Sequence, residues 1–256
     1  MTELKAGAQL YTVREFTKTI QGMADALTKS REIGYKGVQI SGLGDVNPGE
    51  VAHLAEDNGI TIAATHFGWN EFLRDLDRVI ETHQLWNCSH AAIGGLPKEY
   101  YSLDGLDRFL FELNPIAEKL DSVGISFSYH NHNHELVHYD GLTWLERLYK
   151  LAPSETLKAE LDVYWLVAGG SDPVKWICDL GDRQPVIHFK DMQVDRDRIQ
   201  RFAEVGEGNL NWPRIIDACR RVGVEWAFVE QDQCYGKDPF ECLAISYRHM
   251  REMGIG

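Results

Sequence analysis

Short runs of apolar residues alternate with longer amphipathic stretches along most of the chain. In the amphipathic stretches, apolar residues recur at the spacing of one helix face, as at Ile20, Met23 and Leu27, which predicts helices that pack against a core. Helix starts are predicted at Asn211 and Asp172, because each can cap a helix and has a proline close behind it. The predicted strands are Ala6–Val13, Gly37–Ser41, Thr61–His66, His90–Gly94, Ile125–His130, Leu157–Val163, Val186–Lys190 and Trp226–Gln231.

Glycines mark the joins from helix to strand. Gly34, Gly59, Gly124 and Gly223 each end a helical stretch and precede a predicted strand, where glycine adopts a left-handed backbone conformation at little steric cost. Eight strands and about eight helices in 256 residues correspond to roughly 30 residues per βα unit, as in a TIM barrel. A doubly wound sheet is the alternative, but no glycine-rich phosphate loop follows the first strand. We therefore predict an α/β fold, a (β/α)8 TIM barrel, as a single domain over residues 1–256, with residues 94–101 as a loop.

Composition narrows the functional classes. The chain has 26 Lys+Arg against 39 Asp+Glu, a formal net charge of −13, which disfavours a nucleic-acid binder because such proteins need a concentrated basic surface. No stretch has the roughly 18–20 apolar residues of a membrane helix, and the first residues show no export signal. The five cysteines are scattered without a CxxC pair, which fits free thiols in a reducing compartment. We therefore expect a cytoplasmic protein that binds neither nucleic acid nor membrane.

Histidines and carboxylates end several of the predicted strands. His66 ends the third, His130 the fifth, Asp162 the sixth, His188 the seventh and Glu230 the eighth. Because the C-terminal ends of barrel strands face one mouth, we expect these groups to converge there. Taken singly, a strand-end acid is often a helix cap and a strand histidine often packs in the core. Together they favour a site for one divalent cation, Mn²⁺, Mg²⁺, Co²⁺ or Zn²⁺.

A cation at such a mouth suggests sugar chemistry. It could hold neighbouring carbonyl and hydroxyl oxygens and polarise the carbonyl, so that a carboxylate or histidine could remove the adjacent proton. Bases on both faces of the substrate would allow isomerisation or epimerisation, and one base with an acid at a β-hydroxyl would allow elimination. If the fifth strand continues, His130, His132 and His134 share one face; otherwise this segment is a solvated loop.

Five segments in this order resemble the xylose isomerase-like TIM-barrel superfamily, the sugar phosphate isomerase/epimerase group, which is related to inosose dehydratases and keto-sugar epimerases. The segments are residues 129–135, 160–165, 186–191, 205–212 and 228–230. The resemblance covers the whole chain. It implies a divalent metal held by Glu, Asp, His and Glu from strands five to eight.

The resemblance also implies residue roles. Asp162, His188 and Glu230 match three of the family's ligands directly. Many relatives place a glutamate where this chain has His130, so Glu135 is assigned as the fourth ligand, with His132 as its substitute. Catalysis is assigned to Glu230, Glu135 and His130, and substrate contact to His66, His132, Trp165 and Lys190. Trp165 stands where many relatives carry a histidine that contacts substrate in the epimerases, and residues 206–208 are expected to shape a loop beneath the metal.

The function that follows is a divalent-metal-dependent isomerase or epimerase that acts on a sugar or keto-sugar by proton abstraction next to a carbonyl. A lyase or dehydratase on keto-inositols or 3-keto-glycosides is the alternative. Two further readings are weaker: an endonuclease IV-like DNA repair enzyme with three zinc ions, which the −13 charge opposes, and a carbohydrate-binding barrel without activity. The expected partner is a small-molecule carbohydrate, phosphorylated or not. A homo-oligomer is expected only from the general frequency of homo-oligomers among soluble enzymes.

Overall fold

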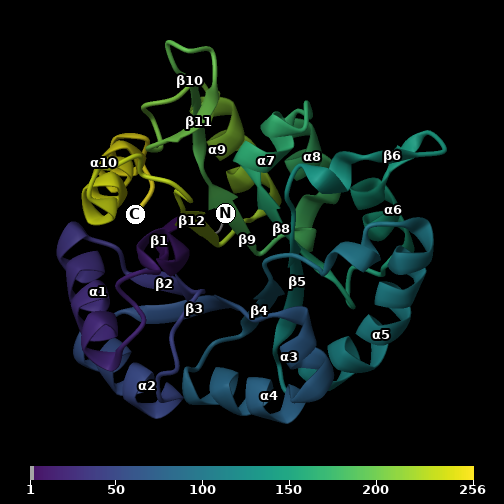
Figure 1. The fold of residues 1–256 in the computed structure, drawn as a ribbon, viewed down its shortest axis with the longest axis horizontal. Helices are drawn as coiled ribbons and strands as arrows, with labels where there is room; N and C mark the ends of the chain where they lie inside the picture. Colours follow the sequence, from purple (N-terminus) through teal and green to yellow (C-terminus); the bar gives the residue numbers. More distant parts are fainter. Residues whose placement is uncertain (1–2) are drawn as a thin grey trace.

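The computed structural model describes residues 3–256, and in this range eight parallel strands close into a barrel in the order β1-β12-β9-β8-β5-β4-β3-β2. The helices form a ring outside the strands (Figure 1). The barrel strands are β1 Lys5–Gln9, β2 Gly37–Ile40, β3 Thr61–His66, β4 His90–Ile93, β5 Ser126–His130, β8 Lys158–Asp162, β9 Val186–Phe189 and β12 Trp226–Val229. Each predicted strand overlaps one of these, and the predicted TIM barrel is confirmed.

The helices follow the expected signals. They are α1 Ile20–Ile33, α2 Pro48–Asp57, α3 Trp69–Arg74, α4 Leu76–Leu85, α5 Leu103–Asp121, α6 Trp144–Leu151, α7 Val163–Ala168, α8 Pro173–Leu180, α9 Trp212–Val222 and α10 Pro239–Glu252. Asn211 caps α9 and Asp172 caps α8, each by accepting a hydrogen bond from a backbone N–H of the first turn. All four glycines predicted at the joins have positive φ. Within residues 3–256, none of the helices is long and apolar enough to cross a membrane.

The first predicted strand extends well beyond the strand in the structure. The first was predicted to reach Val13, but β1 ends at Gln9 and a 3₁₀ helix, Leu10–Val13, follows, because the Gln9 side chain accepts a hydrogen bond from Tyr11 N at 3.1 Å and turns the chain. The fifth strand ends at His130, as predicted, so His130, His132 and His134 do not share one strand face. The next residues form a turn and a short 3₁₀ helix, His134–Leu136.

Two β-hairpins leave the barrel. One, β6 His138–Tyr139 with β7 Leu142–Thr143, lies between β5 and α6, and the other pairs β10 Asp191–Val194 with β11 Gln200–Ala203 (Figure 1). The segment predicted as a loop at residues 94–101 connects β4 to α5 and holds a 3₁₀ turn, Lys98–Tyr100.

Asp191 organises the loop that follows the second hairpin. Its carboxylate accepts hydrogen bonds from Gly206 N at 2.9 Å, Gly208 N at 3.1 Å and Trp212 Nε1 at 2.6 Å. A Cβ on Gly208 would lie 2.3 Å from Asp191 Oδ1, so only glycine lets the backbone come this close. The role of residues 206–208 is thus to let the loop wrap around a buried carboxylate.

Large aromatic side chains fill one end of the barrel. The rings of Trp226 and Phe228 on β12 stack with centroids 6.0 Å apart and planes 10° apart. Neighbouring strands leave room for them through glycines: a Cβ on Gly37 would lie 2.5 Å from the Trp226 ring, and a Cβ on Gly7 would lie 2.5 Å from the Phe228 ring. Polar chemistry is therefore confined to the other end.

We predict that Gly37→Ala lowers the free energy of unfolding by about 1–3 kcal/mol, because a methyl group there overpacks the Trp226 ring. Gly49→Ala is the matched control, since Gly49 lies in the first turn of α2 and its added Cβ would meet only Asn47 Oδ1. Urea denaturation of both variants measures the difference. Equal stability of the two variants would contradict this account of the barrel interior.

Candidate active site

Four side chains converge at the C-terminal ends of the barrel strands. His130 ends β5, Asp162 ends β8, His188 lies on β9 and Glu230 follows β12. All four are buried, and one ligand atom of each lies within 4.8 Å of the ligand atoms of the others. His188 Nδ1 is 2.7 Å from Glu230 Oε2, and His130 Nε2 is 3.2 Å from Asp162 Oδ2. The expected convergence of Asp162, His188 and Glu230 is therefore present, with His130 as the fourth member.

The Lys190 ammonium lies between the two carboxylates of this cluster. Its Nζ is 3.1 Å from Asp162 Oδ2 and 2.9 Å from Glu230 Oε2. Burial alone would raise the pKa of Asp162, but Lys190 and His130 outweigh it and hold that pKa below its ordinary value. Burial would also raise the pKa of Glu230, but Lys190 and His188 outweigh this effect and hold that pKa well below its ordinary value. Both carboxylates are therefore ionised and face a cation.

The cluster fits a divalent cation. Two carboxylates and two imidazoles supply hard oxygen and borderline nitrogen donors, the set that Mn²⁺, Co²⁺ and Zn²⁺ bind. The oxygens that face Lys190 already stabilise one positive charge at this place. His130 Nδ1 is buried and has no hydrogen-bond partner among residues 3–256, so no hydrogen bond to this nitrogen orients the ring. The four residues are consistent with a divalent metal site.

A second buried carboxylate, Glu160, lies beneath the cluster on the same strand as Asp162. Its Oε1 is 3.0 Å from His188 Nε2 and also contacts His66 Nε2, and its Oε2 accepts a hydrogen bond from Gln39 Nε2 at 2.9 Å. Burial would raise the pKa of Glu160, but His66 and His188 lower it well below its ordinary value. The His188 ring is thus held from behind, with Nδ1 turned toward Asp162 and Glu230.

Glu160 and Gln39 were not identified from the sequence. Both point into the barrel, where Gln39 Oε1 accepts hydrogen bonds from Gln9 Nε2 at 2.9 Å and from His188 Nε2 at 2.6 Å. The sequence could have indicated Glu160, because side chains alternate between the two faces of a strand. Glu160 lies two residues before Asp162 on β8 and therefore points to the same face.

Glu135, predicted as the fourth ligand, lies outside the four-residue cluster. Because β5 ends at His130, the chain turns before Glu135, which instead groups with His132 and His134. Its carboxylate accepts hydrogen bonds from Tyr129 Oη and from His132 N, each at 2.8 Å. Burial raises its pKa to about 7. The structure therefore gives Glu135 contacts that hold the His132 loop.

A cavity of about 860 Å³ opens above the cluster. All four residues predicted to contact substrate, His66, His132, Trp165 and Lys190, line it together with His130 and Glu230. Within the described chain, His132 Nδ1 and Trp165 Nε1 are buried polar atoms without a hydrogen-bond partner. Buried polar groups are normally paired, so these two atoms lack the partner that the protein ordinarily supplies.

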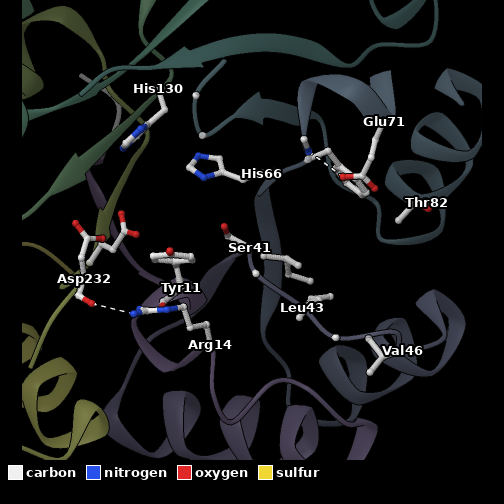
Figure 2. Close-up of a pocket in the computed structure, with 18 of the residues that line it drawn as sticks. Tyr11, Arg14, Ser41, Leu43, Val46, His66, Glu71, Thr82, His130 and Asp232 are labelled. Atoms are coloured by element: carbon white, nitrogen blue, oxygen red, sulfur yellow. Dashed lines mark hydrogen bonds between the residues drawn. The ribbon is translucent and has the colours of Figure 1, made fainter. Parts of the chain in front are cut away.

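Arg14 and Asp232 close one side of the cavity and were also missed in the sequence. Asp232 Oδ1 is 3.1 Å from Lys190 Nζ, and the Asp232 carbonyl accepts a hydrogen bond from Arg14 Nη2 at 3.2 Å. Figure 2 shows this contact on the side of the cavity that faces His130 and His66. Burial, with the charges of Glu230 and Asp162, raises the pKa of Asp232 to about 7 against the opposing effect of Lys190.

Comparison with known proteins assigns the family. A family model described as Xylose isomerase-like TIM barrel matches residues 27–239. The chain belongs to this family. Its predicted resemblance is therefore confirmed over most of its length.

The curated relatives that match this chain are inosose dehydratases. Two inosose dehydratases from Lacticaseibacillus casei, one from strain BL23, are 27% identical in an alignment of 160 positions that covers 56% of this chain and 53% and 52% of theirs. This chain therefore spans about half the length of the curated relatives it matches.

Solved structures share the barrel along nearly the whole chain. A sugar phosphate isomerase/epimerase from Parabacteroides distasonis ATCC 8503 aligns with a TM-score of 0.81 at 23% identity, covering 99% of this chain and 96% of that chain. An L-ribulose 3-epimerase aligns with a TM-score of 0.76 at 17% identity, covering 100% of this chain and 95% of that chain. At these identities the likeness establishes the common fold.

We predict that Glu160→Gln weakens Mn²⁺ binding about 10–100-fold, because the hydrogen bond that orients His188 from behind loses its charge. Isothermal titration of the metal-free protein with Mn²⁺ measures the affinity. Glu207→Gln is the matched control, since Glu207 also pairs with a histidine, His249 at 2.7 Å, but is exposed. Unchanged affinity in Glu160→Gln would show that Glu160 does not position His188.

Proposed function

We propose that this protein is a divalent-metal-dependent isomerase or epimerase that acts on a sugar or keto-sugar. The observation that carries the proposal is the buried group of His130, Asp162, His188 and Glu230. This group lies at the C-terminal ends of the strands, where TIM-barrel enzymes build their active sites. Two of its members, His130 and Glu230, line the cavity above it, so they are accessible to a substrate.

These four residues are the metal ligands that we propose, with His130 in the place assigned to Glu135 from the sequence. This assignment is supported by their proximity, because one ligand atom of each residue lies within 4.8 Å of the ligand atoms of the others. A bound divalent cation would polarise a substrate carbonyl and so acidify the neighbouring C–H bond. Glu160 would orient the ring of His188 from the other side, the arrangement that metal-bound histidines commonly have.

Glu230 is the proton acceptor that we propose. Its contacts with His188 and Lys190 both use Oε2, and its Oε1 has no hydrogen-bond partner in the described chain. A carboxylate that is ionised and lines the cavity can take a proton from the carbon next to a carbonyl. Return of this proton to the neighbouring carbon gives an isomer.

Other groups of the cavity would bind the sugar hydroxyls. His132 Nδ1 and Trp165 Nε1 supply buried polar atoms without protein partners, and Lys190 supplies a cation beside them, 5.7 Å from the Trp165 ring. Burial and the nearby His130 lower the pKa of His132 to about 2, so its imidazole is neutral at pH 7. In an epimerisation, return of a proton on the opposite face needs a second group that carries a proton at pH 7, and a neutral His132 imidazole serves as a hydrogen-bonding group for the substrate and not as that acid.

A dehydratase is the second candidate function. The specific observation in its favour is the identity of the curated relatives, which are inosose dehydratases. The first step is the same proton abstraction, and the two functions differ only in whether a β-hydroxyl then leaves as water.

We predict that His130→Ala and Asp162→Ala lose the metal, whereas Glu135→Ala retains it. The first two substitutions remove atoms of the four-residue cluster, and the third removes a carboxylate outside it. Mass spectrometry of protein purified without chelators measures the metal content, with about one ion per chain expected in the unsubstituted protein.

The opposite pattern, with metal lost from Glu135→Ala and retained by His130→Ala, would restore the assignment made from the sequence. More than one ion per chain would show that another histidine–carboxylate group of this site also binds metal.

We predict that the Mn²⁺-loaded protein exchanges the proton next to the carbonyl of a keto-sugar with solvent, and that Glu230→Gln lowers this exchange about 100-fold or more. Incubation of a panel of keto-sugars in D₂O, followed by NMR and mass spectrometry, detects the exchange. A deuterated product of otherwise equal mass identifies an isomerase or epimerase, and loss of water identifies a dehydratase.

The matched control for this test is Glu241→Gln, because Glu241 is exposed in the first turn of α10 and does not line the cavity. Metal content is measured in both variants, so that a lost ligand is distinguished from a lost base. Absence of exchange in every metal-loaded sample would contradict the proposed function.

A further inference from the structure

The cavity is larger than a single sugar ring requires. A hexose has roughly twelve non-hydrogen atoms, and even at the about 30 Å³ that one water molecule takes up in the liquid, they would fill less than half of the cavity. The cavity volume of about 860 Å³ lies instead near the upper end of the about 300–1,000 Å³ that is typical of pockets for larger small molecules.

The additional space has an apolar lining, which we call the apolar arm. It is formed by Leu43, Val46 and Pro48 at the β2–α2 connection and by Phe67 and Trp86 on the neighbouring βα unit. The rings of Phe67 and Trp86 stack with centroids 6.4 Å apart. Figure 2 shows Leu43 and Val46 at the far side of the cavity from His130 and Asp232.

Two polar groups near the apolar arm are engaged by the protein itself, and Ser41, Asp45 and Thr82 also line this part of the cavity. Trp86 Nε1 donates a hydrogen bond to the Pro48 carbonyl at 2.8 Å. The Glu71 carboxylate accepts from Gly68 N at 2.9 Å and from Arg78 Nη2 at 2.7 Å. At the other end, near the four-residue cluster, the buried His132 Nδ1 has no hydrogen-bond partner within residues 3–256. The two ends of the cavity therefore suit two kinds of chemistry.

We infer that the substrate is a sugar that carries an apolar, ring-sized substituent, as in an aryl glycoside, with the substituent in the apolar arm. The inference rests on the proposed function for the sugar end, where the cluster and the unpaired polar atoms lie. The apolar end follows from the lining, because burial of an aromatic ring against Leu43, Val46 and Phe67 removes apolar surface from water, and the nearby Trp86 Nε1 already has a partner. A free monosaccharide would leave this surface in contact with water.

Binding of two stable probes tests the inference. We expect p-nitrophenyl β-D-glucopyranoside to bind the metal-loaded protein about tenfold or more tightly than methyl β-D-glucopyranoside, as measured by isothermal titration. Val46→Asp and Val46→Trp should both abolish this preference, the first by placing a charge in the apolar arm and the second by filling it. Val194→Asp is the matched control, because Val194 is 58% exposed on β10 and does not line the cavity.

The inference is overturned if the aryl glycoside binds no more tightly than the methyl glycoside. The same holds if neither glycoside binds, since the apolar arm should hold the aryl group by itself. Preference that persists in both Val46 variants overturns it as well. Metal content and thermal stability are checked in each variant. Because the probes carry no ketone, failure of this test leaves metal binding and proton exchange on keto-sugars untouched, and failure of the proposed function leaves the aryl preference measurable.

Discussion

Three carboxylates, Glu160, Asp162 and Glu230, are buried at one end of the barrel, and their charges decide what the other side chains there must do. An ionised group in such a place is stable only if a cation or several hydrogen-bond donors face it. Lys190 meets this need for Asp162 and Glu230, and His188 connects Glu230 to Glu160. The site is thus one network of paired charges. A divalent cation would enter a place that already holds positive charge.

The network depends on the register of the barrel. Asp162 on β8 lies beside His188 on β9, and His130 on β5 lies beside Glu160 on β8. A shift of one residue in either pair would turn one member of the pair out of the barrel, because side chains alternate along a strand. At the other end of the barrel, Trp226 on β12 packs closely against Gly37 on β2.

The loops contribute differently from the strands. Strand residues form the rigid group around His188, whereas the apolar arm is built from connections that lie outside the barrel. This division is common in TIM barrels, where the strands hold the reactive groups and the loops select the substrate.

The sequence by itself determined the barrel and three of the residues that converge at its mouth. Periodic apolar runs and glycine joins are local signals, since they reflect how each segment buries its own apolar face and ends its own helix. Strand-end Asp162, His188 and Glu230 were likewise identified because parallel strands bring their C-terminal ends together. These inferences need only the order of the elements along the chain.

Only the tertiary structure decided where β5 ends and hence whether His130 or Glu135 joins the cluster. Strand ends depend on which neighbouring backbone groups are available for pairing, a property of the assembled barrel. The role of Glu160 is also visible only in the tertiary structure. A buried carboxylate is understood from the groups that it contacts, and its partner His66 lies far away in the sequence. The apolar arm has the same origin: Val46 and Trp86 line one cavity only after two βα units pack side by side.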